Sequence, residues 1–84
     1  MEWEDESGKY RYEGHFNENN EFHGKGVLQE PQGRYEGTFV NGEKDGENCV
    51  YVSENGNRYE GSYVNGYREG YGRVYRDDKL IYKG

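Results

Sequence analysis

Three side chains in this sequence carry the soft donor atoms that bind transition metals: His15, His23 and Cys49. Structural zinc sites draw on close pairs such as Cys-x2-Cys or His-x3-His, and these spacings do not occur here. Cys49 also has no histidine or other evident base nearby that would activate its thiol as a nucleophile. The sequence therefore predicts neither a metal site nor a catalytic cysteine.

The carboxylates and glycines give no stronger case for catalysis. A weak calcium site at Asp77 and Asp78, beside Glu69, is the alternative to a solvated turn, and the turn is favoured. The Gly-Lys-Gly and Gly-Tyr-Gly segments lack the ending and the following helix of a phosphate-binding loop. A catalytic pair of acids needs a pocket to perturb its pKa values, and a thin sheet offers none. We therefore predict a protein that is not an enzyme and needs no cofactor.

An internal repeat determines where these residues lie. A Tyr-Glu-Gly segment starts at Tyr12, Tyr35 and Tyr59, and a fourth start, Tyr-Lys-Gly, lies at Tyr82. The four tyrosines are 23, 24 and 23 residues apart, and a fixed period in this range is typical of repeat proteins. The sequence predicts one domain with a partial leading repeat over residues 1–11, full repeats over 12–34, 35–58 and 59–81, and a truncated one over 82–84.

Each repeat is predicted to form a β-hairpin. The first strand carries Tyr-x-Gly-x-Phe/Tyr, and its period of two places these residues on one face. Asn-Gly pairs at residues 41–42 and 65–66 favour tight hairpin turns, because both residue types tolerate positive φ. We predict an all-β fold, an elongated, twisted, single-layer antiparallel meander of about eight strands. Its first tip loop is expected over residues 17–23, and its last return strand over 71–75.

The aromatic rings are predicted to lie over glycines of the return strands, filling the space of the missing side chains. On this ring face the return strands would carry three sets: Gly24, Gly26 and Leu28; Gly46, Asn48 and Val50; Gly70, Gly72 and Val74. Asn48 would then replace a glycine, and we expect looser packing there. Cys49 and Tyr51 are expected on the opposite face, and Val52 on the ring face.

Composition agrees with a thin aromatic fold in a reducing compartment. Aromatic residues make up 17% of the chain, and a buried ring covers roughly 150–250 Å². Cys49 is the only cysteine, so no internal disulfide can form, and a cytoplasmic location is expected. We find no apolar run of about 20 residues and no signal-peptide core. The net charge of −6 disfavours binding to nucleic acid and to anionic lipid.

The segments starting at Tyr12, Tyr35 and Tyr59, with the return segments GKGVL and GYGRVY, resemble the MORN repeat (membrane occupation and recognition nexus). The resemblance covers Tyr12 to Gly84. Departures are an extra loop residue before Gly24, Asn48 in place of glycine, and Asp45 or Glu69 where the family often has histidine. The resemblance implies a single-layer solenoid of β-hairpins without enzymatic activity. It also implies an interaction scaffold of the kind found in cytoskeletal, ciliary and junctional proteins.

The predicted function is therefore a scaffold that binds a partner peptide or helix, basic or amphipathic, on its aromatic sheet surface. The alternatives are a membrane- or phosphoinositide-associated module and an accessory segment of a larger enzyme or cytoskeletal assembly. Open sheet edges also suggest self-association. Tyr51 and Tyr75 are either cover for the sheet or part of the binding surface. The candidate partner-binding residues are Tyr12, Phe16, Tyr35, Phe39, Tyr59, Tyr63, Tyr51, Tyr75, Glu36 and Glu60.

Overall fold

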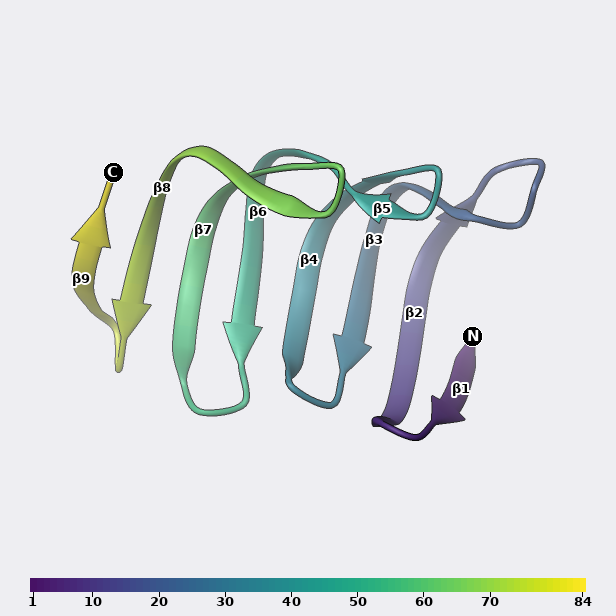
Figure 1. Ribbon diagram of the computed structural model, residues 1–84, viewed down its shortest axis with the longest axis horizontal. Coiled ribbons are helices and arrows are strands. Elements are labelled where there is room, and N and C mark those ends of the chain that lie inside the picture. The colour runs from purple at the N-terminus through teal and green to yellow at the C-terminus, as the bar shows by residue number, and fades with distance from the viewer.

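The computed structural model describes all 84 residues as nine β-strands and no helix (Figure 1). The strands are β1 (Glu2–Asp5), β2 (Gly8–Phe16), β3 (Phe22–Glu30), β4 (Gly33–Val40), β5 (Glu43–Lys44), β6 (Gly46–Ser53), β7 (Asn57–Val64), β8 (Tyr67–Arg76) and β9 (Lys79–Lys83). The chain contains no helix of the length and apolarity that crossing a membrane requires.

All nine strands belong to one antiparallel sheet. Eight of them are hydrogen-bonded in the order β1-β2-β3-β4-β6-β7-β8-β9, and the two-residue β5 pairs with β4 at a hairpin tip. The two termini lie at opposite ends of the ribbon (Figure 1). The molecule measures 38 × 25 × 17 Å. The predicted elongated, single-layer antiparallel meander is confirmed.

Each hairpin bends in the middle because its return strand is longer than its outgoing strand. Between the pairs Tyr12–Leu28 and Phe16–Phe22, β2 advances four residues while β3 uses six. The third repeat shows the same difference. Extra residues in one strand form a bulge that bends the pair, and Gly24 adopts the left-handed φ of 82° within it. The hairpin tips therefore fold over one side of the sheet, which we call the ring side.

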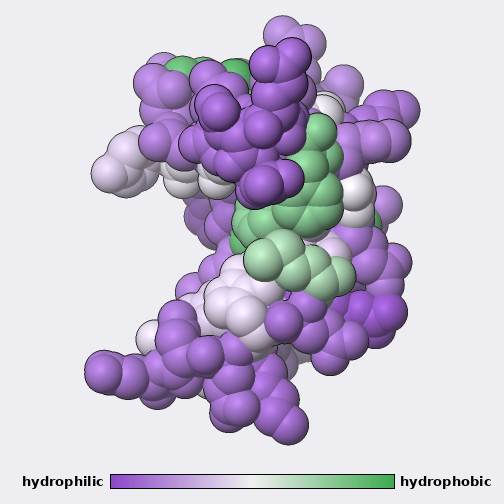
Figure 2. Space-filling model, turned by 90° about the vertical axis from the view of Figure 1, so that its right-hand side faces the viewer, coloured by the Kyte–Doolittle hydropathy of each residue, from purple (hydrophilic) through white to green (hydrophobic).

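The folded tips give the ribbon a hollow on the ring side. In Figure 1 the tips pass in front of the strands. Seen along the ribbon, the molecule has a C-shaped outline with hydrophilic residues on both arms and hydrophobic residues gathered near the middle (Figure 2). The hollow opens on the side toward which the tips fold.

The first tyrosine of each repeat fills the inside of the bend. The hydroxyls of Tyr12, Tyr35 and Tyr59 each donate a hydrogen bond to the backbone carbonyl three residues later, at 2.7, 2.7 and 3.1 Å. Each ring lies over a glycine: a Cβ added to Gly26 would stand 2.6 Å from the hydroxyl oxygen of Tyr12. One added to Gly72 would stand 2.5 Å from the Tyr59 ring. The predicted placement of rings over return-strand glycines is confirmed in the first and third repeats. In the second repeat, Tyr35 lies over Gly37 of its own strand and against Cys49 of the return strand.

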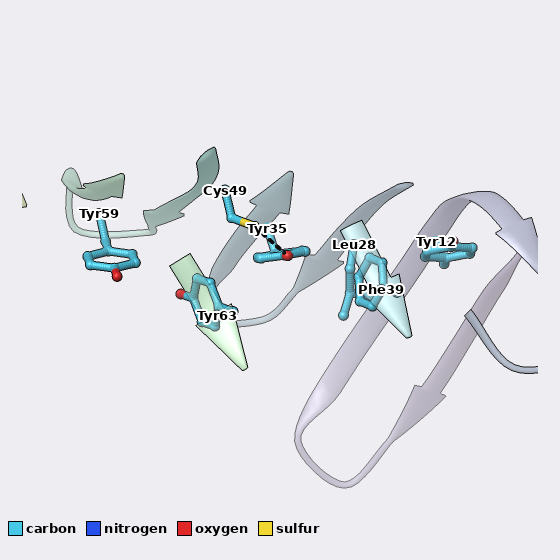
Figure 3. Close-up of a cluster of buried hydrophobic side chains, with 7 residues drawn as sticks. All are labelled: Tyr12, Leu28, Tyr35, Phe39, Cys49, Tyr59 and Tyr63. Carbon is cyan, nitrogen blue, oxygen red and sulfur yellow. Dashed lines mark hydrogen bonds between the residues drawn. The ribbon is translucent and has the colours of Figure 1, made fainter. Parts of the chain in front are cut away.

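The rings form a single row through the ribbon instead of a compact core. Figure 3 shows Tyr12, Tyr35 and Tyr59 one after another, with Phe39 and Tyr63 between them. Seven buried hydrophobic residues make up the row: Tyr12, Leu28, Tyr35, Phe39, Cys49, Tyr59 and Tyr63. Since the row crosses every repeat, no repeat buries its rings without its neighbours.

The second repeat shows that the predicted alignment of its return strand was wrong. Between the pairs Tyr35–Tyr51 and Phe39–Lys44, β4 advances four residues while the returning chain uses seven. The other repeats use six. Asn48 lies in this longer bulge in the left-handed region, with φ of 58°, and its side chain is exposed. Asn48 therefore does not replace a ring-face glycine, and the looser packing expected there has no basis.

The shift places Cys49 at the position that Gly26 and Gly72 hold in the other repeats. Cys49 is fully buried, pairs with a glycine of β7, and takes Tyr51 with it to the ring side. Val50 and Val52 correspondingly move to the opposite side, where they pair with Glu36 and Arg34. The prediction placed Cys49, Val50, Tyr51 and Val52 on the wrong faces because it counted two residues from Gly46 to the next inward position, as in the other repeats. The second repeat has one residue more after Gly46, and this shifts every later residue of β6 to the other face.

Two strand boundaries also differ from the prediction. β3 begins at Phe22, inside the expected loop over residues 17–23. The Phe22 ring stacks on the Tyr12 ring, with centroids 3.9 Å apart and planes 13° from parallel. β8 runs from Tyr67 to Arg76, well before residue 71. Both strands extend into the tips because strand pairing resumes beyond each bulge, where Phe22 pairs with Phe16 and Tyr67 with Val64.

Candidate functional site

Five of the ten candidate residues are buried on the ring side: Tyr12, Tyr35, Phe39, Tyr59 and Tyr63. Tyr12 meets Phe39 edge-to-face across the first and second repeats, with centroids 5.4 Å apart. Tyr35 meets Tyr63 in the same way across the second and third repeats, at 5.2 Å. Such pairs are favourable beyond the area that they bury. These five side chains hold consecutive repeats together and offer almost no surface to another molecule.

Burial also keeps the hydroxyls of these tyrosines protonated. Loss of water raises the pKa of Tyr12, Tyr35, Tyr51, Tyr59 and Tyr63 above the usual value of 10. The rise in pKa is largest at Tyr35, where burial is joined by Cys49, whose sulfur lies 3.0 Å from the hydroxyl oxygen. The rings therefore act as neutral hydrogen-bond donors in the interior, and nothing poises one of them for proton transfer near neutral pH.

The rings of Tyr12, Tyr35 and Tyr59 are each covered by a residue that was not predicted from the sequence. The covers are Phe22, Lys44 and Arg68, each paired with the aromatic residue near the end of its outgoing strand. The Phe22 ring, the Lys44 ammonium and the Arg68 guanidinium lie 3.9, 5.4 and 4.3 Å from the ring centroid of their own tyrosine. A signal was present in the sequence, because each cover stands two positions before the first glycine of its return strand.

Two candidate residues on the ring side remain accessible. Phe16 is 43% exposed, and Tyr51 is half-buried. The ammonium of Lys44 lies 5.1 Å from the centroid of the Tyr51 ring and 2.9 Å from a carboxylate oxygen of Glu30. The accessible part of the ring side therefore includes the exposed parts of two aromatic rings, Phe16 and Tyr51. Lys44, beside Tyr51, is already paired with Glu30.

The other candidate residues, Glu36, Glu60 and Tyr75, lie on the opposite side of the sheet, which we call the outer side. Glu36 pairs with Val50, and Val50 pairs with Glu60, so the three form a row across adjacent strands. The guanidinium carbon of Arg58 lies 4.4 Å from the centroid of the Tyr75 ring. The structure therefore divides the ten candidates between two sides of the ribbon.

The outer side carries one ion pair from each repeat. In every first strand an arginine bonds the glutamate two residues later, and the pairs are Arg11–Glu13, Arg34–Glu36 (3.5 Å) and Arg58–Glu60 (3.0 Å). Residues two apart in a strand point to the same side, so the arginines and the glutamates form two parallel stripes. All of these side chains are partly or largely exposed, and such pairs stabilise a fold only weakly.

Three shallow hollows follow one another along the outer side. The first, of about 220 Å³, contains Glu13 and Val27 in its lining. The second, of about 680 Å³, contains Val27, Glu36 and Val50. The third, of about 270 Å³, contains Val50 and Glu60. Neighbouring hollows share a valine, so they form one groove across the strands, which we call the outer groove: Glu13, Val27, Glu36, Val50 and Glu60.

The residues considered for metal binding or catalysis are not brought together. No group of three or more His, Cys, Asp or Glu side chains is placed to hold a metal ion. His23 accepts a hydrogen bond from the backbone N–H of Asn41 through Nδ1, at 3.3 Å. Asp77 and Asp78 form a turn with positive φ, and Asp78 faces Arg58 at 3.4 Å. Cys49 is part of the ring row, and Asp77 and Asp78 belong to a turn.

A ribbon of consecutive bent hairpins, each with a tyrosine inside its bend, defines a β-hairpin repeat protein. The MORN repeat family matches this chain at three consecutive stretches, residues 12–33, 35–58 and 59–79. The chain belongs to the MORN repeat family. Comparison with curated proteins gives no match. Members of the family are in general repeat modules that bind proteins or membranes, and the repeat itself is not catalytic.

Proposed function

We propose that this protein is a non-catalytic scaffold that binds an extended or helical segment of a partner protein across several repeats at once. The observation that carries the proposal is the outer side of the sheet, where three repeats present the same charged residues at one regular spacing. A ligand that spans three repeats makes three sets of contacts but loses its translational and rotational entropy only once.

The acidity of the chain supports a basic partner. The net charge of the chain is −6. Each section of the outer groove has a glutamate in its lining, and each also has a basic residue: Arg11 and Arg34 in the first, Lys25 in the second and Arg73 in the third. Opposite charge on a partner speeds its encounter with this surface and orients it there. Of the predicted contact residues, we retain Phe16 and Tyr51 on the ring side, and Glu36, Glu60 and Tyr75 on the outer side. The five buried aromatic residues act indirectly, because they hold these surfaces in place.

Selection from a random peptide library displayed on phage tests the proposal. The folded chain is the bait, and a Tyr12→Ala, Tyr35→Ala double variant that has lost the ring row is the matched control. We expect enriched peptides that are basic, that bind the folded chain at micromolar Kd and that do not bind the control. Failure to enrich any peptide, or equal binding to the unfolded control, would contradict the proposal.

Flotation with lipid vesicles separates this function from the membrane alternative. Vesicles of phosphatidylcholine, with and without a phosphoinositide, are mixed with the chain at near-physiological salt. The acid excess predicts that the chain stays with the soluble fraction in both cases. Flotation that depends on the phosphoinositide, combined with failure of the peptide selection, would replace the scaffold proposal with a membrane-binding function.

A further inference from the structure

The outer groove has a spacing that can be compared with the spacing of a ligand. Its residues follow the sheet register, with Glu13 opposite Val27, Val27 opposite Glu36, Glu36 opposite Val50, and Val50 opposite Glu60. Adjacent strands lie about 4.8 Å apart, so successive glutamates are separated by about 9.6 Å. The valines between them have the same interval.

The direction of the groove restricts how a ligand can be held. The groove crosses the strands, so the backbone amides of a ligand cannot join the hydrogen-bond ladder of the sheet. Recognition must come from side chains, and the ligand backbone must remain solvated. A polyproline II helix meets both conditions, since it has no internal hydrogen bonds and exposes its backbone to water.

The repeat of that helix matches the interval between the glutamates. Polyproline II has three residues per turn and rises 3.1 Å per residue, so every third side chain lies on one face at intervals of about 9.3 Å. A lysine or arginine at every third position would meet Glu13, Glu36 and Glu60 in turn. The two residues between the first and second basic positions would pass over Val27, and the two between the second and third would pass over Val50.

The row of glutamates also has an end. The residue opposite Glu60 on β8 is Arg73, and Arg73 is paired with Lys83 on β9. The next basic position of a ligand would therefore meet positive charge. The groove offers three sites for basic side chains, one from each repeat.

We propose that the outer groove binds a partner segment in the polyproline II conformation that carries a basic residue at every third position, three times in succession. This inference rests on the proposed scaffold function and names the partner chemistry and the side of the sheet. The glutamates are free to take part, since they are partly or largely exposed and their pairs with arginine are of the weak surface kind.

Fluorescence anisotropy with synthetic peptides of one composition tests the spacing. The probe carries three consecutive Lys-Pro-Pro units, and the matched control joins all of its lysines in one block ahead of all of its prolines, at the same length and charge. We expect the evenly spaced peptide to bind about tenfold more tightly than the block peptide at low salt, because only it reaches three glutamates together. A fourth Lys-Pro-Pro unit should add less than about twofold, since it faces Arg73. Equal affinity for the two peptides would show unspecific attraction and overturn the proposal.

Variants of the chain test the side of the sheet. Glu36→Gln should weaken binding of the evenly spaced peptide by about threefold to tenfold, whereas Glu18→Gln, with the same change of charge in the first tip loop, should leave it unchanged. Glu36→Lys should prefer a peptide whose middle lysine is replaced by glutamate. Thermal unfolding of each variant establishes that it folds.

The same peptides separate this inference from the scaffold proposal. If Phe16→Ser abolishes binding while Glu36→Gln has no effect, the ligand lies on the ring side, so the groove assignment is wrong and the scaffold stands. If the evenly spaced peptide does not bind while the phage selection yields other peptides, the polyproline II chemistry is wrong and the scaffold again stands. Failure of both experiments removes the scaffold and the groove together.

Discussion

The first and third repeats bend in the same way but cover their tyrosine with different chemistry. Three phenylalanine rings surround Tyr12, with centroids between 3.9 and 5.4 Å from its own. The Tyr63 ring meets Tyr59 edge-to-face with the ring centroids 5.5 Å apart, and the guanidinium carbon of Arg68 lies 4.3 Å from the Tyr59 ring centroid. The backbone geometry is therefore compatible with either an aromatic or a cationic cover.

The difference shows which part of the repeat is structural and which is free to vary. The tyrosine over paired glycines recurs in both repeats, and its hydroxyl makes the same hydrogen bond to the carbonyl three residues later. The cover has only to be flat, or positively charged, over the face of the ring. A guanidinium meets this need through cation–π attraction and stays in contact with water. We therefore expect stability to decrease from the first repeat to the third.

The largest expected effect comes from removing the two tyrosines. Tyr12→Ala should lower the free energy of unfolding by about 3–5 kcal/mol, because it removes a fully buried ring from the contact of three phenylalanines. Tyr59→Ala should cost about 2–3 kcal/mol, since an exposed guanidinium can move into part of the space. Urea unfolding followed by Trp3 fluorescence measures both. Equal losses of unfolding free energy in the two variants would contradict the idea that the residue covering each tyrosine determines how stable its repeat is.

Removing the covers gives the next largest difference. Phe22→Ala should cost about 2–4 kcal/mol, as it takes a stacked ring from Tyr12. Arg68→Ala should cost about 0.5–1 kcal/mol, the typical strength of a cation–π contact near the surface. In a chain of this size each kcal/mol lowers Tm by about 4–8 °C, so calorimetry resolves the two variants. An arginine variant as unstable as the phenylalanine variant would contradict the idea of an interchangeable cover.

Alkaline pH should affect every repeat through the buried tyrosines. Their pKa values are raised in the folded state, mainly by loss of water. A raised pKa means that the folded chain holds the phenolic proton more tightly than the unfolded chain, so the contribution of these tyrosines to stability is constant below pH 10 and falls above it. Tyr35→Phe should cost about 1 kcal/mol at pH 7 by removing a buried hydrogen bond. Its deficit should shrink above pH 10, because phenylalanine cannot ionise; a deficit independent of pH would contradict this.

The smallest expected effect concerns the bulge that distinguishes the second repeat from the other two. Asn48→Gly should change the free energy of unfolding by no more than about 0.5 kcal/mol, because both residues adopt the left-handed region readily. Asn48→Val should cost about 1–2 kcal/mol, since a β-branched residue is strained at that φ. Chemical denaturation of the pair decides the point. A gain of more than about 1 kcal/mol for the glycine variant would restore the overturned idea of poor packing at this site.

Much of the fold followed from particular sequence features. The four tyrosine starts predicted the number of repeats, and the alternation in Tyr-x-Gly-x-Phe predicted which residues of the first strands share a face. The return strands were harder, because their bulges break the alternation between the tip and the glycine. Asn48, Cys49 and Tyr51 were misplaced for this reason, and Phe22 was taken for loop.

The candidate site was harder to predict than the fold. Sequence alone marked the tyrosines as a binding surface, since a one-layer sheet was expected to leave its rings exposed. It did not predict that Lys44 and Arg68 would reach back over those rings. It placed Glu36 and Glu60 on the polar face but gave no indication of a groove there. Exposure depends on what lies above a ring, and that information is not contained in the spacing along one strand.

The sequence by itself determined that this protein is a chain of β-hairpins, because the recurrence of about 23 residues marks each repeat and the alternation of two residues marks each first strand. Only the tertiary structure decided which aromatic residues are interior and which side of the ribbon is available to another molecule. That outcome depends on the bend at each bulge. The bend brings the hairpin tip over the tyrosine of its own repeat, so contacts between separate strands determine what remains accessible.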